Sequence, residues 1–179
     1  FKKYYLILLK NRLLKYELET LNKMDGIMCI SNNDTIWMKK RSISEVTNVP
    51  FTINAENDIV LSKFANTIFH IGSMDWRANQ VGVSWFINEV FPIVINKKND
   101  ITLQLAGRNM PDIFINKQTK NIIIHSEVEN AKEFMNKFNL MIVPLHSGSG
   151  IRIKILEAMA LGKTIISTTI GASGIICKD

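Results

Sequence analysis

SGSGIRIKILEAMALGKTII, residues 147–166, opens with the glycines Gly148 and Gly150, continues as a mostly apolar run, and ends after Gly162 in a short β-branched segment. The apolar side chains lie almost all round a helix, which predicts a buried helix over residues 151–161. Residues 164–167 are typical of a short buried strand. A glycine turn, a helix and a strand in this order indicate one unit of an α/β sheet.

The same alternation extends upstream to about residue 64. Short apolar runs predict strands over residues 67–71, 101–106, 121–124 and 140–143, and helical patterns follow over about 79–96, 111–116 and 131–138. Pro92 is expected to kink or end the first of these helices. Strands that alternate with helices predict a Rossmann-like parallel sheet with helices on both faces, and ligands then bind beyond the carboxyl ends of the strands.

Residues 1–57 predict a different and incomplete α/β unit, followed by the main domain over 58–179. Its expected elements are a helix over 3–22 stopped by Asp25-Gly26, a buried strand over 26–30, a short helix capped by Ser31 or Asn32, and a strand over 49–53. Residues 54–63 are expected to be the linker. The main domain is expected to lack its closing helices.

Composition bounds the function. The chain is 46% hydrophobic and 21% charged, which is ordinary globular usage and excludes a disordered tail, a collagen or a disulfide scaffold. No run approaches the roughly 20 apolar residues that span a bilayer. Cys29 and Cys177 are interpreted as reduced thiols, which favours a cytoplasmic protein.

The positive charge is concentrated near the start. Residues 1–45 hold nine Lys and Arg against five Asp and Glu. Such an excess indicates either contact with an acidic partner, such as a membrane surface, or a solvated helix face. Nucleic acid is disfavoured, because the excess is mild and has no aromatic residues interleaved on one face.

The 147–166 stretch also carries the chemistry. Backbone amides at a helix start form an anion site, and Lys154 and Glu157 share one helix face three residues apart. Arg152 is expected in the first turn of that helix. A cation near the helix mouth and a carboxylate one turn deeper suit a diphosphate followed by a ribose diol. The structural alternative is a plain Lys154–Glu157 ion pair.

Two common phosphate motifs are excluded, and no metal motif is present. Gly162-Lys163-Thr164 runs from helix to strand, the reverse of a P-loop, and Ile153 stands where a third glycine of a dinucleotide fingerprint is required. His70, His125 and His146 have no metal-ligand spacing, and each is interpreted as a loop residue or a satisfied polar residue rather than a ligand.

Three segments together resemble the donor-binding half of a family 4 glycosyltransferase of the two-Rossmann (GT-B) type. They are FHIGSMDWRANQVGVSWFINEVFP, LQLAGRN and MIVPLHSGSGIRIKILEAMALGKTIISTTIGASGI, and the resemblance covers about residues 64–175 in order. Residues 1–57 resemble the end of the acceptor-side domain of such enzymes.

The resemblance implies sugar transfer from a nucleoside-diphosphate sugar to a saccharide or lipid-linked acceptor, usually with retention and without a metal for the diphosphate. Glu157 matches the second Glu of the family's Glu-x7-Glu signature, which holds the ribose, and Ser149 replaces the first, which contacts the sugar. The implied catalytic cations are Lys154, Arg152 and Arg77. The donor-binding residues are Gly72, Ser73, Gly107, Arg108, Ser126, Val128, Ser147, Gly148, Ser149, Gly150, Ile151 and Glu157.

The setting implied is cell-surface polysaccharide synthesis in a bacterial cytoplasm, with peripheral contact to the inner membrane face through residues 1–45. Two alternatives stay open on the same fold. One is a GT-B nucleotide-sugar epimerase, and the other is a non-catalytic nucleotide-binding module.

Overall fold

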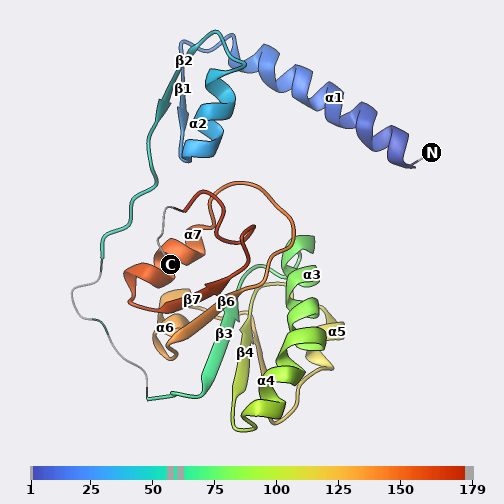
Figure 1. The fold of residues 1–179 in the computed structure, drawn as a ribbon, viewed down its shortest axis with the longest axis vertical. Helices are drawn as coiled ribbons and strands as arrows, with labels where there is room; N and C mark the ends of the chain where they lie inside the picture. The colour runs from blue at the N-terminus through green and yellow to red at the C-terminus, as the bar shows by residue number, and fades with distance from the viewer. Residues whose placement is uncertain (1, 56–58, 60–62, 176–179) are drawn as a thin grey trace. The chain divides into compact units, whose positions relative to one another are not determined.

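The structure is a computed structural model that describes residues 2–55, 59 and 63–175. It contains two compact units, Phe1–Thr52 with Gly174–Asp179, and Ile53–Ser173. The larger unit is built on a five-stranded parallel sheet (Figure 1). Its strands are β3 (Thr67–Ile71), β4 (Thr102–Ala106), β5 (Ile122–Ser126), β6 (Leu140–Val143) and β7 (Thr164–Ser167), in the order β5-β4-β3-β6-β7. The predicted Rossmann-like sheet is confirmed.

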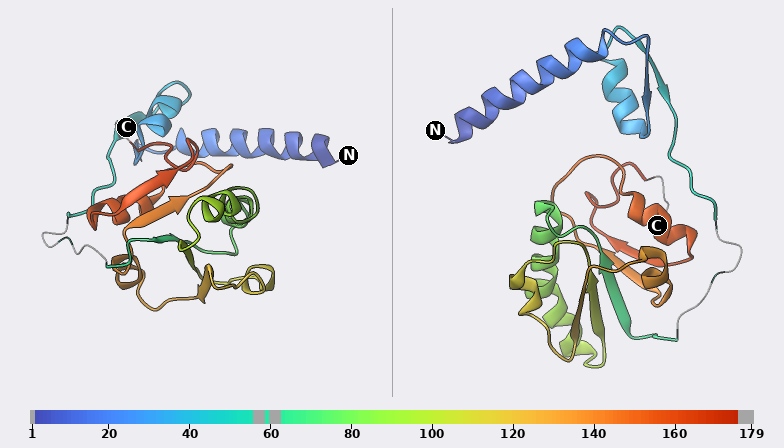
Figure 2. Two further views of the ribbon diagram at one scale, coloured as in Figure 1. Left: turned by 60° about the horizontal axis from the view of Figure 1, so that its bottom comes forward. Right: turned by 180° about the vertical axis from the view of Figure 1, so that it is seen from behind.

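Helices cover both faces of this sheet, as Figure 2 shows. One face carries α3 (Arg77–Trp85), a π-helical turn (Phe86–Val90), α4 (Phe91–Lys97) and α5 (Asp112–Ile115), and the other carries α6 (Ala131–Asn136) and α7 (Ile153–Ala160).

Side chains alternate between the two faces along each strand. In β3, Ile68 joins the buried cluster that contains Phe91 of α4. The next residue, Phe69, is fully buried on the other face, with its ring 6.0 Å from Phe134 and 5.7 Å from Phe138. Because both faces are covered, the strands are mostly apolar rather than alternating, as doubly covered parallel strands should be, and His70 and Gln104 are buried polar exceptions.

The helix after β3 differs from the expectation at both its start and its middle. It begins at Arg77 rather than Asn79, and a π-helical turn precedes Pro92. Proline has no N–H, and its ring excludes the carbonyl four residues back. The wider turn, in which the Phe91 N–H donates to the Phe86 carbonyl, lets the chain continue as helix on both sides.

α7 is shorter and less buried than predicted. It begins at Ile153, two residues later than expected. Ile155 and Ala158 are buried, whereas Ile153 and Met159 are 39% and 45% exposed. The expectation of a helix buried all round was therefore wrong, because a single face of α7 packs on the sheet.

The smaller unit consists of α1 (Lys2–Leu21), β1 (Gly26–Cys29), α2 (Asn32–Lys39) and β2 (Glu45–Asn48), with β1 and β2 parallel. Ser31 caps α2, as predicted, by accepting a hydrogen bond from the Asp34 amide at 3.0 Å. The strand expected over 49–53 is wrong, because pairing ends at Asn48 and Pro50 has no N–H with which to extend it. β1 is also more exposed than predicted, and only its last residue, Cys29, is buried. Cys29 is a free thiol, and Cys177 lies outside the described residues.

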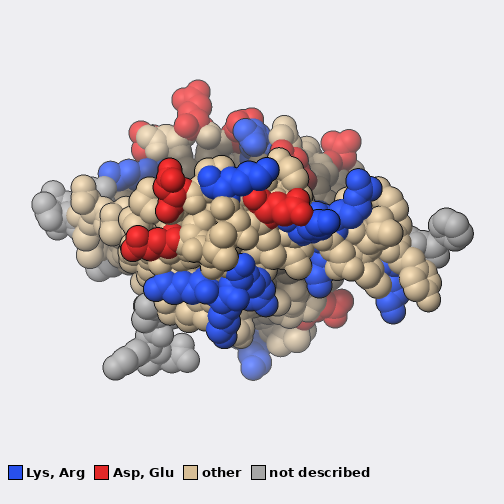
Figure 3. Space-filling model, turned by 90° about the horizontal axis from the view of Figure 1, so that it is seen from above, with Lys and Arg blue, Asp and Glu red and all other residues tan. Residues whose placement is uncertain are grey.

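α1 exposes large apolar side chains, including Tyr4, Leu8, Leu13 and Tyr16. Its exposed Lys15–Glu19 pair, at 3.7 Å, adds little stability. The face in Figure 3 shows basic and acidic side chains interspersed with uncharged ones. No helix in the described ranges combines the length and apolar character needed to cross a bilayer.

Candidate functional site

The site lies where the strand order reverses. β3 is flanked by β4 and β6, so the chain leaves β3 and β6 in opposite directions, and loops diverge beyond their carboxyl ends. A cavity of about 750 Å³ opens between these loops and is called the loop cavity here. It is lined by Gly72, Ser73, Asp75, Trp76, Asn79, Arg108, Leu145, Gly148, Ser149, Ile151, Arg152, Ile153 and Lys154.

Lys154 supplies the charge in the loop cavity. Its Nζ donates to the Ile71 carbonyl at 3.1 Å and to Asn79 Oδ1 at 3.4 Å, both of which are neutral acceptors. Burial, and secondarily the charge of Arg152, lowers the pKa of Lys154 to about 8. No carboxylate among the described residues pairs with this ammonium. A half-buried cation without a counter-ion favours a bound anion, because the charge needs a partner to offset its desolvation.

Gly72 allows the ammonium to approach. A Cβ at Gly72 would lie 2.8 Å from Lys154 Nζ and 3.1 Å from Asn79 Nδ2, too close for either atom to stay in place. A Cβ at Gly107 would collide with the Gly72 carbonyl oxygen. The Gly107 amide meanwhile donates to the Ser126 carbonyl at 2.6 Å. Backbone contacts therefore bind together the loops after β3, β4 and β5.

The loop before α7 is closed by Arg152. This guanidinium donates to the Ser149 carbonyl and, at 2.8 Å, to the Gly150 carbonyl. Gly148 and Gly150 have φ of +122° and +77°, which other residues rarely adopt. Arg152 was expected in the first turn of α7, but it is the N-cap residue. The amides of Ser149 to Ile151 belong to the preceding loop, so they flank the cavity rather than open the helix.

A polar and aromatic wall faces Lys154 across the cavity. Asp75 accepts hydrogen bonds from Ser73 Oγ at 2.6 Å and from Asn109 Nδ2 at 3.1 Å, and it lies 3.9 Å from the Arg108 guanidinium. These contacts, the Ser73 hydrogen bond above all, lower the pKa of Asp75. Trp76 is 64% exposed at the rim of the cavity.

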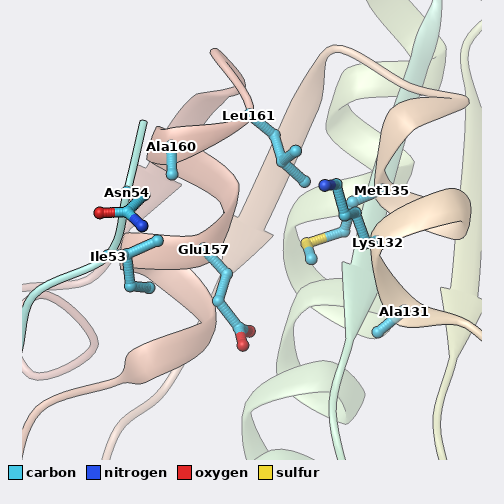
Figure 4. Close-up of a pocket in the computed structure, with 8 residues that line it drawn as sticks. All are labelled: Ile53, Asn54, Ala131, Lys132, Met135, Glu157, Ala160 and Leu161. Atoms are coloured by element: carbon cyan, nitrogen blue, oxygen red, sulfur yellow. The ribbon is translucent and has the colours of Figure 1, made fainter. Parts of the chain in front are cut away.

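Glu157 lines a different space. Figure 4 shows it extending from α7 between this helix and α6, in a pocket of about 150 Å³ lined by Ile53, Asn54, Ala131, Lys132, Met135, Glu157, Ala160 and Leu161. Lys154 and Glu157 form no ion pair in the described part of the chain, so the structural alternative of a plain pair is wrong. Glu157 lies three residues, about 4.5 Å, further along α7 than Lys154.

The structure brings together eight of the predicted residues and leaves seven off the cavity wall. Those on the wall are Gly72, Ser73, Arg108, Gly148, Ser149, Ile151, Arg152 and Lys154. Those off it are Arg77, Gly107, Ser126, Val128, Ser147, Gly150 and Glu157. Arg77 lies on the surface and donates to Gln80 Oε1 at 3.4 Å. The sequence did not predict Asp75, Trp76 and Asn79 as cavity residues, although all three follow β3 within the segment FHIGSMDWRANQVGVSWFINEVFP.

The histidines are placed differently from one another. His125 Nε2 donates to Gln104 Oε1 at 2.6 Å, and His146 packs edge-on against Trp85 with ring centres 4.5 Å apart. His70 is fully buried at the end of β3, and its Nε2 has no hydrogen-bond partner among the described residues. The interpretation of His70 as a satisfied polar residue therefore holds for Nδ1, which lies 2.9 Å from the Ile142 carbonyl oxygen, and is wrong for Nε2. No three His, Cys, Asp or Glu side chains within the described ranges form a metal-binding group.

Known proteins share both sequence and fold with this chain. A family model described as "Glycosyl transferases group 1" matches residues 65–179. An uncharacterized 44.6 kDa protein in the cps region of Klebsiella pneumoniae is 24% identical over 169 residues, which are 89% of this chain and 43% of the relative. The chain thus spans less than half the length of this relative.

Solved structures give the same fold. A mutant of S. aureus TarM in complex with fondaparinux, alpha-GlcNAc-glycerol and UDP superposes with a TM-score of 0.74 at 17% identity, over 92% of this chain and 34% of TarM. The pneumococcal O-GlcNAc transferase GtfA in complex with UDP and GlcNAc gives 0.69 at 12% identity, over 87% and 32%. These likenesses confirm the fold.

Proposed function

Because this chain belongs to the group 1 glycosyltransferases, we propose that its loop cavity binds the diphosphate of a nucleoside-diphosphate sugar. The whole protein would transfer that sugar to a saccharide or lipid-linked acceptor in cell-surface polysaccharide synthesis. The observation that carries the proposal is the Lys154 ammonium, held among neutral acceptors in a cavity at the strand-order reversal. Two neighbours with this fold, TarM and GtfA, are solved in complex with UDP, which supports a nucleoside diphosphate here.

The chemistry follows from charge. When the sugar–phosphate bond breaks, negative charge grows on the departing diphosphate, and a fixed cation lowers the barrier by stabilising it. Lys154 is fixed by the Ile71 carbonyl and Asn79, so it needs no reorganisation during the reaction. A single preorganised donor of this kind contributes about 3 kcal/mol to the transition state. Arg152 supports it by closing the adjoining loop.

Glu157 is assigned to the ribose. It stands three residues, about 4.5 Å, further along α7 than Lys154, and its carboxylate lines the pocket between α7 and α6. A nucleotide whose diphosphate meets Lys154 therefore reaches Glu157 by extending its ribose from the loop cavity into that pocket. A carboxylate accepts two hydroxyl hydrogen bonds from a diol. The donor's base and sugar are left open.

Three finer features belong to the proposal. Transfer proceeds with retention, the diphosphate is neutralised by protein groups without a metal, and the protein acts on the cytoplasmic side of a bacterial inner membrane, with residues 1–45 at its surface. The metal-independent reading is supported by the cation already in the cavity. It predicts that diphosphate binding persists in excess chelator, and a dissociation constant that collapses with chelator and recovers with manganese would contradict it.

The test separates the two anchoring residues. Binding of UDP, GDP and inorganic diphosphate to the full 179-residue chain is measured by calorimetry. Lys154→Met should weaken all three more than tenfold, whereas Glu157→Gln should weaken the two nucleotides and leave inorganic diphosphate unchanged. Lys120→Met, which removes an exposed lysine that lines neither pocket, is the matched control. No binding of any diphosphate at millimolar concentration would refute the proposed function.

A further inference from the structure

His70 has one nitrogen in use and one without a partner. Its Nδ1 lies 2.9 Å from the Ile142 carbonyl oxygen. A carbonyl oxygen can only accept, so Nδ1 carries the proton. Burial, and secondarily the charge of Lys154, lowers the pKa of His70 to about 3, so the ring is neutral at physiological pH. Nε2 is therefore a bare acceptor in a residue only 1% exposed, with no partner among the described residues.

This bare acceptor and the Lys154 ammonium converge on Gly72. The Cβ position of Gly72 lies 3.4 Å from His70 Nε2 and 2.8 Å from Lys154 Nζ. An ammonium has three N–H groups. Two of them go to the Ile71 carbonyl and Asn79, so the third is available to an acceptor on this side.

We propose that His70 is a positioning residue for the diphosphate site: its Nε2 accepts the remaining Lys154 N–H across a single water, and so holds the ammonium beside Gly72. A buried acceptor without a hydrogen bond costs folding free energy. The Lys154 ammonium, which lies close to the same Gly72 Cβ position, is the donor that removes this cost. The assignment deepens the proposed function and rests on it. His70 touches no substrate, and it acts through Lys154.

The position of Nε2 explains why a histidine suits β3 at this point. The ring spans from the Ile142 carbonyl on β6 to the Cβ position of Gly72, a residue that lines the loop cavity. The other charged groups on the cavity wall are Arg152 at the start of α7, Asp75 after β3 and Arg108 after β4. Arginine stays protonated in this pH range. A change in diphosphate affinity near pH 8 therefore reports the protonation of Lys154.

A matched pair of variants tests the assignment. Gln reaches as many bonds from Cβ as Nε2 and keeps an acceptor there, whereas Asn reaches only as far as Nδ1. His70→Asn should weaken UDP and inorganic diphosphate about tenfold, and His70→Gln should stay within a few fold of the wild type. The pH midpoint of binding should move lower in His70→Asn, because an ammonium that loses an acceptor loses its proton more readily. In a Lys154→Met background the two variants should bind alike.

A second measurement uses the native histidine. The ¹⁵N resonance of His70 Nε2 should shift in Lys154→Met, even though no residue of β3 has changed. A packing role alone predicts equal losses of melting temperature and affinity in both His70 variants, an unmoved pH midpoint and an unshifted Nε2 resonance, and that result overturns the assignment. Failure of the wild-type chain to bind any diphosphate refutes the proposed function instead, while the resonance still decides whether the two side chains meet.

Discussion

His70 makes the larger unit sensitive to acid. Its pKa is lowered from 6.5 to about 3 in the folded chain, so between these values the unfolded chain binds a proton that the folded chain does not. Stability therefore falls as pH drops through this window, by roughly 1.4 kcal/mol per pH unit from this residue alone. Thermal unfolding at pH 7 and pH 4.5 measures the loss. His70→Gln, which cannot titrate, should show a clearly smaller difference, and an equal difference would contradict the prediction.

Lys154 and Gly72 could be predicted at the residue scale, and His70 could not. A lysine in an apolar helix after a glycine-rich loop is unusual enough to single out. A histidine within an apolar strand is either a hydrogen-bonded polar residue or a ligand-binding residue. The sequence does not say which of its ring nitrogens has a hydrogen-bond partner. Asp75, Trp76 and Asn79 lie between the end of β3 and the first turn of α3, and nothing in their spacing indicates which side chains line the cavity.

Among the contacts between elements, the one between the loops after β3 and β4 should be the least tolerant of substitution. Gly107→Ala places a Cβ against the Gly72 carbonyl oxygen, which is backbone and cannot rotate away. We expect a loss of about 1–3 kcal/mol in unfolding free energy, typical of overpacking, together with weaker diphosphate binding because Gly72 faces Lys154. Denaturant unfolding and calorimetry measure both effects.

Gly26→Ala is the control for that substitution. A Cβ there would lie 3.8 Å from the Glu45 carbonyl oxygen, an ordinary contact in β1 of the smaller unit. It should leave both stability and diphosphate binding almost unchanged. If Gly107→Ala also leaves stability and diphosphate binding unchanged, the backbone contact between the two loops does not maintain the shape of the cavity.

Elements with strong periodicity were predicted well, and their ends were not. The strands after residue 64 match to within one or two residues, because short apolar runs between polar loops have few other interpretations. The π-helical turn before Pro92 was missed, since sequence patterns show that a proline disturbs a helix but not how the backbone adjusts. The strand predicted over residues 49–53 was wrong, because its apolar residues suggest a strand whereas Pro50 has no N–H for strand pairing.

At the scale of the whole molecule, the chain spans 43% of its curated relative and about a third of the superposed enzymes. GT-B transfer takes place between two domains, and the smaller unit described here has only two paired strands. We expect the 179-residue chain to bind donor diphosphate but to transfer no sugar. Multiple-turnover transfer by this chain to any saccharide or lipid-linked acceptor would show that transfer needs no further domain.

Membrane contact is a separate prediction for the longer parent protein. Basic residues near an anionic leaflet contribute roughly 1 kcal/mol each, so the excess charge of residues 1–45 should favour anionic liposomes. Co-sedimentation with anionic and neutral liposomes measures this, and equal sedimentation would contradict it. Salt should weaken the anionic case, because it screens surface charge.

The neutral surroundings of Lys154 also bear on how this chain would respond to laboratory evolution. With its pKa lowered to about 8, the half-buried ammonium works against folding at neutral pH, by up to about 3 kcal/mol, until a ligand offsets it. Methionine has a similar length and no charge, so a library selected for heat resistance alone should enrich Lys154→Met. The most thermostable variants would then be those that bind no diphosphate. Selection of stabilised variants of this domain should therefore be carried out with nucleotide present.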